Sequence, residues 1–221
     1  MNAMKIRLQL KSAATFGRGD GVAGLVDGEI EHDRFGFPFL RGRTLKGLLA
    51  ESAENIVYTL ELQHKEGWRT IQKQLFGDPG RGYAEQGILR IGDACLPQAI
   101  RYLVQKEQEQ TKTIFTQENV LQSLTGIRKQ TAVNHEGGSE HASLRAIRVL
   151  LPEIILHAPL SFRIATEPTE KQLAFLTATL LDLRHAGTGR NRGRGWLEAD
   201  LMAENEIETD RHFQKFADLM A

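Results

Sequence analysis

The sequence predicts an α+β fold built on a ferredoxin-like sheet, and three observations support this. Strand-like segments lie near both ends of the chain, at 4–12 and 196–201, and helical patterns occupy much of the sequence between them. The length of 221 residues and the hydrophobic content of 41% are sufficient for one domain with a sizeable core. No internal repeat is present, and the chain is short for two complete sheets in tandem.

The first 80 residues predict one strand, a second short strand and two helices. Residues 4–12 alternate apolar and polar side chains, as a strand with one buried face does. Phe35, Phe37 and Phe39 alternate in the same way and predict a short edge strand that packs into the core, or alternatively a stacking platform for nucleobases. Thr44 is placed to cap a helix that continues to about Gln63, and a second helix is predicted at 67–76.

In the middle of the chain, at 87–148, a short predicted strand is followed by mostly polar helices and two extended arms. A strand is predicted at 87–94, followed by helices at 97–110 and 116–124 that are polar outside one narrow stripe. This composition predicts a peripheral helical insertion at about 98–125. Residues 126–148 predict two extended arms that meet at a glycine-containing tip.

The C-terminal part returns to strands and helices. Residues 149–164 predict a β stretch interrupted at Pro152 and Pro159. Pro168 is expected in the first turn of the next helix, whose apolar face holds Leu173, Leu176, Leu180 and Leu183. A last helix is predicted at 209–220, with Phe213, Phe216 and Leu219 facing inward.

The stretch Gly187–Gly195 (Gly-Thr-Gly-Arg-Asn-Arg-Gly-Arg-Gly) is the strongest functional signal. It contains four glycines and three arginines and no acidic residue. Glycine allows the backbone to approach a ligand closely, and arginine offers planar, permanently charged donors to phosphate oxygens. The stretch therefore predicts a cradle for a polyanion. A flexible linker is the alternative, but a linker is not needed between a helix and a strand.

The charges are separated along the chain although the formal net charge is +0. The charged residues of segments 38–47 and 184–195 are all basic, whereas those of segments 19–33 and 200–210 are all acidic. Such separation is compatible with a basic groove in an otherwise neutral protein.

Composition excludes several classes of protein. The single cysteine, Cys95, excludes an internal disulfide and a multi-cysteine zinc site, and its apolar neighbours favour a role in the core. The sequence contains no signal-peptide pattern and no apolar run of the ~20 residues that span a bilayer. We therefore expect a soluble, cytoplasmic protein without a membrane segment.

Three segments in this order resemble the repeat-associated mysterious protein (RAMP) superfamily. Phe39–Gly47 resembles the entry of its first helix, with Leu45, Lys46 and Gly47 matching and arginine standing in place of the usual proline at 41 and serine at 43. Residues 87–93 followed by 126–148 resemble its central strand and thumb hairpin, and Gly187–Gly195 resembles its C-terminal glycine-rich loop. The order over nearly the whole chain is similar to the guide-coating backbone subunit of type III CRISPR effector complexes.

The resemblance implies a single RAMP-type domain over 1–221, with an RRM-like, ferredoxin-like palm, the insertion at about 98–125 and a thumb hairpin at about 126–148. It implies head-to-tail stacking of copies or paralogues along a CRISPR RNA, so the expected partners are the guide RNA, a target RNA and other effector subunits. Together with the charge pattern, it assigns RNA binding to Arg41, Arg43, Lys46, Arg128, Lys129, Arg145, Gly187, Gly189, Arg190, Arg192, Gly193 and Arg194.

The helix entry is a reasonable phosphate site on physical grounds. A helix N-terminus presents unpaired N–H groups and the positive end of a dipole. Arg41, Arg43 and Lys46 add cations at this end, where a lysine is slightly unfavourable unless an anion is present. The alternative is that Lys46 is a solvated residue of the first turn.

In type III backbone subunits, an aspartate in a loop similar to Gly24–Gly28 cleaves target RNA, and Asp27 is the matching residue. The reaction is attack of a ribose 2′-hydroxyl on the adjacent phosphodiester, which depends on in-line geometry. An aspartate with a pKa of about 3.9 is a poor base at neutral pH. Asp27 is therefore expected to act by holding Mg²⁺ or another divalent metal, or by orienting the hydroxyl, while an apolar wedge from 126–148 (Ile127 or Val133) splays the target.

Alternatives to this site remain. Asp33 stands where the family often has a second, structural aspartate, and the acidic residues at 27–33 are alternatively a solvated loop in a non-catalytic structural subunit. His32 titrates near neutrality and is the candidate acid or base if the protein is instead a guide-processing endoribonuclease. A nucleotide-binding enzyme is disfavoured, because the glycine-rich loop is not followed by Gly-Lys-Ser/Thr.

Overall fold

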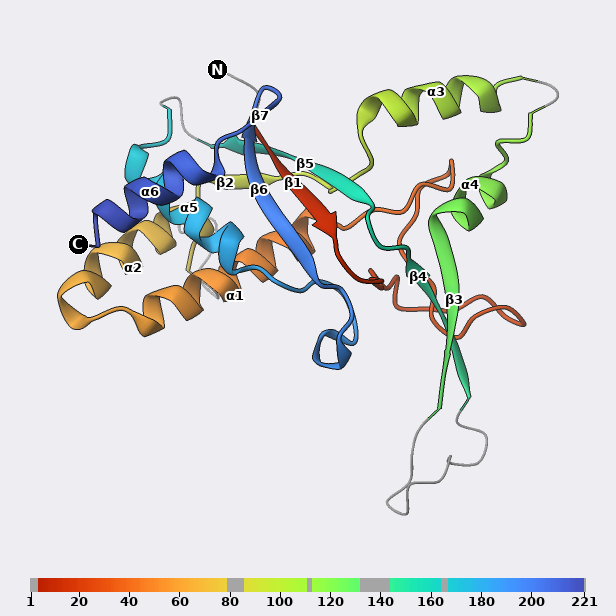
Figure 1. The fold of residues 1–221 in the computed structure, drawn as a ribbon, viewed down its shortest axis with the longest axis horizontal. Helices are drawn as coiled ribbons and strands as arrows, with labels where there is room; N and C mark the ends of the chain where they lie inside the picture. The colour runs from red at the N-terminus through yellow and green to blue at the C-terminus, as the bar shows by residue number, and fades with distance from the viewer. Residues whose placement is uncertain (1–3, 79–85, 111–112, 132–143, 164–166, 221) are drawn as a thin grey trace, which may run out of the picture.

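The computed structural model describes residues 4–78, 86–110, 113–131, 144–163 and 167–220. An antiparallel sheet with the strand order β2-β5-β1-β6-β7 forms its centre (Figure 1). The strands are β1 (Met4–Leu10), β2 (Leu89–Ile91), β5 (Ile155–Phe162), β6 (Leu197–Ala203) and β7 (Glu206–Ile207).

Strand β1 lies between β5 and β6 because one of its faces is wholly apolar. Ile6, Leu8 and Leu10 are fully buried, while the polar residues between them are partly exposed. In the register, Ile6 stands opposite Ala158 on β5 and Leu201 on β6, which are buried as well. The alternation in the sequence therefore identifies the core face correctly.

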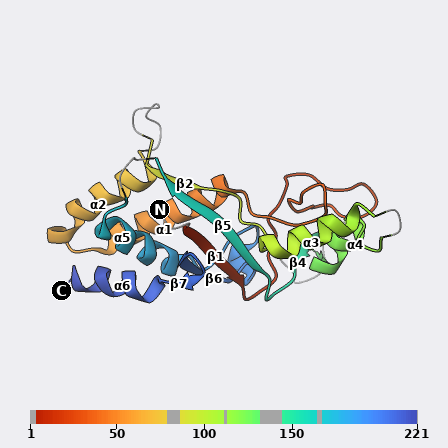
Figure 2. The same cartoon turned by 90° about the horizontal axis from the view of Figure 1, so that it is seen from above.

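Four helices pack on one side of the sheet (Figures 1 and 2). They are α1 (Gly42–Thr59), α2 (Leu62–Phe76), α5 (Glu170–Asp182) and α6 (Thr209–Asp218). The helices α1 and α2 connect β1 to β2, and α5 connects β5 to β6. With the strand order β2-β5-β1-β6, this is the ferredoxin-like topology, which confirms the predicted fold class.

Helix α5 is buried on most of its surface. Leu176 and Leu180 are fully buried, and Phe175 stacks on Trp68 of α2 with ring centroids 5.6 Å apart. Phe216 of α6 closes this cluster at 4.9 Å from Trp68. Aromatic pairs at these separations add to the free energy of burial, so the cluster fixes the outer helices on α5.

The segment between β2 and β5 contains two helices and a hairpin. The helices are α3 (Gln98–Gln108) and α4 (Gln117–Leu124), and the hairpin consists of β3 (Thr125–Gln130) and β4 (Arg145–Leu150). All four elements lie on the side of the sheet away from α1 and α5 (Figure 2). Among its described residues α3 has none fully buried, whereas α4 buries Val120 and Leu121. The predicted glycine tip at 137–138 lies outside the described residues.

Two predictions for the N-terminal region were wrong. Thr44 does not cap α1, because the helix begins at Gly42, where the Asp93 carboxylate accepts the backbone N–H at 2.8 Å. A Cβ atom at Gly42 would lie 2.3 Å from the carbonyl oxygen of Ile91, so the close approach of this segment requires glycine. Residues 35–39 form no strand, because Asp33 Oδ1 accepts the N–H groups of Phe35 and Phe37 and folds the chain into a turn. Phe37 is nevertheless buried, as core packing predicted.

Three predictions for the C-terminal part of the chain, on Pro159, Pro168 and Phe213, also differ from the structure. Pro159 lies inside β5 rather than interrupting it, and its carbonyl oxygen accepts the Gly92 N–H at 2.9 Å. Pro168 precedes α5 instead of lying in its first turn, because Thr169 caps the helix in a capping box with Gln172. Phe213 of α6 was expected to face inward, but it is 40% exposed and only stacks on Phe216.

Candidate nucleic-acid interface

The predicted cradle is a compact loop between α5 and β6. Residues Arg190–Arg192 form a 3₁₀ turn, and Gly189 and Gly193 on either side have left-handed backbones with φ of 75° and 70°. The loop is attached to the segment after β1 by two hydrogen bonds, from Thr188 N–H to Thr15 O and from Gly195 N–H to Ala13 O, both 2.9 Å. The arginines are therefore presented by a defined backbone rather than by a linker.

The four glycines of this loop have different roles. A Cβ atom at Gly187 would lie 2.5 Å from Thr15 O, and one at Gly195 would lie 1.9 Å from Ala186 O. These two glycines allow the loop to pack against its own chain. A Cβ atom at Gly189 would lie 3.3 Å from Cδ of the Arg194 side chain, and one at Gly193 would meet no atom of the described residues within 4 Å. The Gly193 side of the loop therefore offers open backbone to a ligand.

The three arginines of the loop differ in their contacts. Arg190 Nη1 lies 3.2 Å from Glu51 Oε2 on α1, and Arg194 Nη2 donates to Gln130 Oε1 on β3 at 2.9 Å. Arg192 is exposed, and no ion pair of its guanidinium occurs within the described parts of the chain. The loop thus bridges the palm and the base of the hairpin, with one guanidinium left to the solvent.

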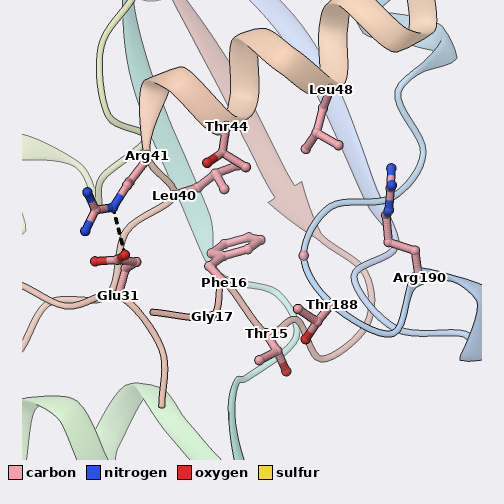
Figure 3. A pocket seen from close by; sticks show the side chains of 11 residues that line it. Thr15, Phe16, Gly17, Glu31, Leu40, Arg41, Thr44, Leu48, Thr188 and Arg190 are labelled. Carbon is pink, nitrogen blue, oxygen red and sulfur yellow. Dashed lines mark hydrogen bonds and ion pairs between the residues drawn. The ribbon is translucent and has the colours of Figure 1, made fainter. Parts of the chain in front are cut away.

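Two hollows meet at the glycine loop. One, of about 270 Å³, lies between the loop and the entry of α1, and its lining includes Thr15, Phe16, Glu31, Arg41, Thr44 and Leu48 (Figure 3). The other, of about 560 Å³, lies between the loop and the hairpin residues Gln130 and Ile147. Both are lined by Gly187, Thr188 and Arg190. The helix entry, the loop and the hairpin therefore border two adjoining hollows, which are together called the groove below.

Several hydrogen-bonding groups at the entry of α1 that were expected to bind phosphate already bond other groups of the protein. Asp93 already accepts the Gly42 N–H, and Arg41 Nε donates to Glu31 Oε1 at 2.7 Å. Lys46 Nζ donates to Leu89 O on β2 at 2.8 Å, and burial, followed by the charges of Arg90 and Arg163, lowers the pKa of this ammonium. The exposed Arg43 and the outer part of the Arg41 guanidinium remain for an anion here.

The basic residues predicted on the hairpin lie at its surface. Arg128 and Lys129 of β3 and Arg145 of β4 are exposed. Ile127, one of the two wedge candidates, is 46% exposed, and the other, Val133, lies outside the described residues. In the register of the hairpin, Arg128 and Arg145 stand on the same face as Gln130 and Ile147, whereas Lys129 stands on the other face.

Most of the acidic segment is held by ion pairs: Glu29, Glu31 and Asp33 each pair with an arginine, whereas Asp27 is exposed. Glu29 is 2% exposed and accepts from Arg148 Nε through both carboxylate oxygens, at 2.9 and 3.1 Å. Arg148 also donates to Thr125 Oγ1 and so links both strands of the hairpin to this segment. Sequence reasoning missed this pair, because Glu29 and Arg148 are far apart in the chain and each looks like an ordinary surface charge.

Asp27 lies against the hairpin with its carboxylate at the surface. Its backbone N–H donates to Ala146 O, and its Oδ2 accepts the Ala146 N–H, both at 2.7 Å. The next residue of β4, Ile147, lines the hollow beside the glycine loop. Asp27 itself does not line that hollow but a separate one of about 310 Å³, formed with residues 21–26. The structure thus brings Asp27 to the hairpin, with Oδ1 still able to accept a hydrogen bond.

The two alternative acid–base residues have other surroundings. Asp33 is ion-paired with Arg101 at 2.8 Å, besides bonding the N–H groups of Phe35 and Phe37. His32 is half-buried, with Nδ1 3.2 Å from Asp33 O. These contacts give Asp33 a structural role in its loop.

The described residues do not by themselves form a complete site for a divalent metal. Among the described residues, no group of three or more His, Cys, Asp or Glu side chains is placed to hold a metal ion. Asp27 supplies a single carboxylate, of which one oxygen already accepts the Ala146 N–H. A divalent metal at Asp27 therefore stays a prediction.

Comparisons with known proteins agree on the fold. A sequence profile of the RAMP superfamily matches residues 7–198. The solved structures that resemble the chain include a subunit of a type III-B Cmr-beta complex bound to cognate target RNA, with a TM-score of 0.63 and 11% identity over 91% of this chain and 97% of that one. A subunit of the apo Cmr-beta complex gives a TM-score of 0.61 at 10% identity, again over 91% and 97% of the two chains. A subunit of a type IV-B CRISPR complex gives 0.54 at 18% identity, over 91% and 90%.

The search of curated protein sequences found no match to this chain. Within the described residues, no helix has the length and apolar character needed to cross a membrane.

Proposed function

Since the chain belongs to the RAMP superfamily, we propose that it is an RNA-binding subunit of a CRISPR effector complex that coats the guide RNA. Its partners in this proposal are the guide RNA, a target RNA that pairs with the guide, and neighbouring effector subunits. The similar subunits of Cmr-beta and type IV-B complexes support the proposal through their fold.

One observation carries the proposal more than any other. Three segments far apart in the sequence, the helix entry, the glycine loop and the hairpin base, line hollows that share Gly187, Thr188 and Arg190. Arg41, Arg190 and Arg192 line these hollows. The exposed Arg43 and Arg128 lie on the same helix entry and the same hairpin. Arginines and backbone amides in such a groove bind phosphates, so recognition of RNA is dominated by its backbone.

The first experiment measures binding of the full chain to a single-stranded RNA at several salt concentrations. We expect affinity to fall steeply as salt rises, because each neutralised phosphate releases counterions. Replacing Arg192 with Ala should weaken binding to all sequences alike and reduce the slope of log K against log salt by about 1.

The matched control is Arg211→Ala. Arg211 is also exposed but lies on α6, at the opposite end of the molecule from the hairpin (Figure 1). This variant should bind like the unaltered chain. Affinity that does not depend on salt, or equal losses in both variants, would contradict the groove.

We propose in addition that Asp27 contributes to cleavage of the target RNA. The support is its exposed carboxylate, which the hydrogen bond from Ala146 N–H orients beside the hairpin. A carboxylate in this position can accept a hydrogen bond from a ribose 2′-hydroxyl and hold it in line with the adjacent phosphodiester.

The test uses the assembled complex with a complementary target. Asp27→Asn keeps an acceptor oxygen for Ala146 but removes the negative charge. We expect cleavage to fall at least a hundredfold while guide binding persists. Cleavage at the original rate would exclude Asp27, and an unaltered complex that binds target without cutting it would favour a structural subunit.

A further inference from the structure

We propose that the smaller hollow, between the entry of α1 and the glycine loop, binds one unpaired nucleobase and that Glu31 selects a base with an amino group. The proposal rests on the RNA binding proposed above. It adds a contact to one base where recognition otherwise depends on the RNA backbone.

The size of the hollow suits a single ring system. Its volume is about 270 Å³, slightly below the ~300–1,000 Å³ that is usual for sites of drug-sized molecules, as expected for a single ring system. Its apolar lining comes from Phe16, Leu40 and Leu48, and Figure 3 shows Phe16 between the Arg41–Glu31 pair and Arg190. Unpaired bases in protein–RNA complexes typically lie on such aromatic and aliphatic side chains.

The polar groups of the hollow have unused hydrogen-bonding capacity. Glu31 is 8% exposed, and its carboxylate bonds Arg41 Nε through Oε1, which leaves acceptor sites on Oε2. Thr15 is 3% exposed, and within the described residues its Oγ1 has no hydrogen-bond partner. Such buried polar atoms are rare in native proteins, and the choice of base depends on Glu31 rather than on Thr15.

The charges around the hollow favour a nucleotide within a chain of RNA. Arg41 and Arg190 stand on opposite sides of it (Figure 3), and the side chain of Arg41 is 59% exposed despite its bond to Glu31. Guanidiniums in these positions suit the phosphates before and after one nucleotide. The base between those phosphates then meets the apolar lining and Glu31.

The carboxylate determines which base is preferred. A glutamate accepts a hydrogen bond from the N4 amino group of cytosine. Uracil presents the O4 acceptor at the same position, where it would face the buried carboxylate without a donor between them. We therefore expect cytosine to be preferred over uracil.

The experiment compares the binding of the full chain to the oligonucleotides C12 and U12 at one salt concentration. We expect C12 to bind more tightly by about fivefold or more. In Glu31→Gln, the side-chain amide can donate to uracil O4, so the preference should disappear or reverse. In Thr44→Trp, the indole should occupy the hollow and remove the preference without changing Glu31.

The control is Tyr58→Trp, at the far end of the same helix, where the side chain is 75% exposed. It should keep the preference for C12. Equal affinity of the unaltered chain for both RNAs would overturn the nucleobase site and leave the proposed function intact, and so would a preference that survives Thr44→Trp. A chain that binds neither RNA would overturn both proposals.

Discussion

Gly193 and Gly195 have nearly the same backbone conformation but different surroundings. Their φ angles are 70° and 69°, in the left-handed region that favours glycine. At Gly193 a side chain would meet no atom of the described residues within 4 Å, whereas at Gly195 it would collide with Ala186 O. Ala186 and Gly195 are held close together because the Ala186 N–H donates to Gly195 O at 2.9 Å. The two glycines therefore differ in whether a side chain could be accommodated at their position.

This difference can be measured by replacing each glycine with alanine. Gly193→Ala should lower the free energy of unfolding by about 1–2 kcal/mol, the cost of a left-handed backbone for an L-residue. Gly195→Ala should lower it by clearly more, because a Cβ atom 1.9 Å from a carbonyl oxygen forces the backbone to move. Denaturant unfolding of the two variants provides the comparison, and equal losses would contradict these roles.

Sequence reasoning identified the charged residues but not their partners. It assigned Lys46 to the phosphate site, yet the ammonium donates to Leu89 O. It had no role for Asp93, which accepts the first amide of α1. Both contacts join segments more than 40 residues apart, so no local pattern could have revealed them. On this geometry, Arg43 is expected to contribute more to RNA affinity than Lys46.

At the level of elements, the segment 27–29 behaves as an additional edge of the hairpin. Gly28 forms a parallel bridge with Ile147, and Arg148 N–H donates to Gly28 O at 2.9 Å. The buried Glu29–Arg148 pair closes the end of this contact. The position of Asp27 is therefore set by β4, so hairpin and acidic segment are expected to move as one unit.

Breaking this pair should be costly. Arg148→Met leaves Glu29 as an uncompensated buried charge, and we expect the free energy of unfolding to fall by about 3–5 kcal/mol. The double variant with Glu29→Gln should recover part of the loss. As a control, Arg69→Met removes a surface ion pair to Glu54 and should cost under ~1 kcal/mol in the same urea titration. Similar losses for the two arginines would contradict the buried pair.

Element types were predictable where one periodicity dominates, as in β1, α1 and α5. The alternation at Ile6, Leu8 and Leu10 and the helical spacing around Leu176 are local properties of the sequence. The ends of elements were less predictable, because distant groups determine them. Asp93 moves the start of α1 to Gly42, and Asp33 turns the segment of alternating phenylalanines.

At the scale of the whole molecule, the topology explains why the site forms where it does. Leu10 pairs with Leu197, so the chain leaving β1 and the loop entering β6 lie at the same end of the sheet. Leu150, at the end of the hairpin, bonds Ala14 through two backbone hydrogen bonds. The three segments of the groove thus converge through sheet register, which the sequence alone indicated only through the resemblance to a family.

The last prediction concerns RNA coated by several copies of the chain. The formal net charge is +0, so copies packed side by side do not repel one another strongly, while the groove supplies the local attraction to RNA. With a long single-stranded RNA and increasing protein, we expect nuclease protection to yield fragments that lengthen in equal steps, one step for each added copy. Arg192→Ala should require more protein to reach each step but should leave the step unchanged, because the spacing depends on contacts between copies rather than on affinity. A single protected length at every ratio of protein to RNA would instead indicate one copy per RNA, and the guide-coating role would then be wrong.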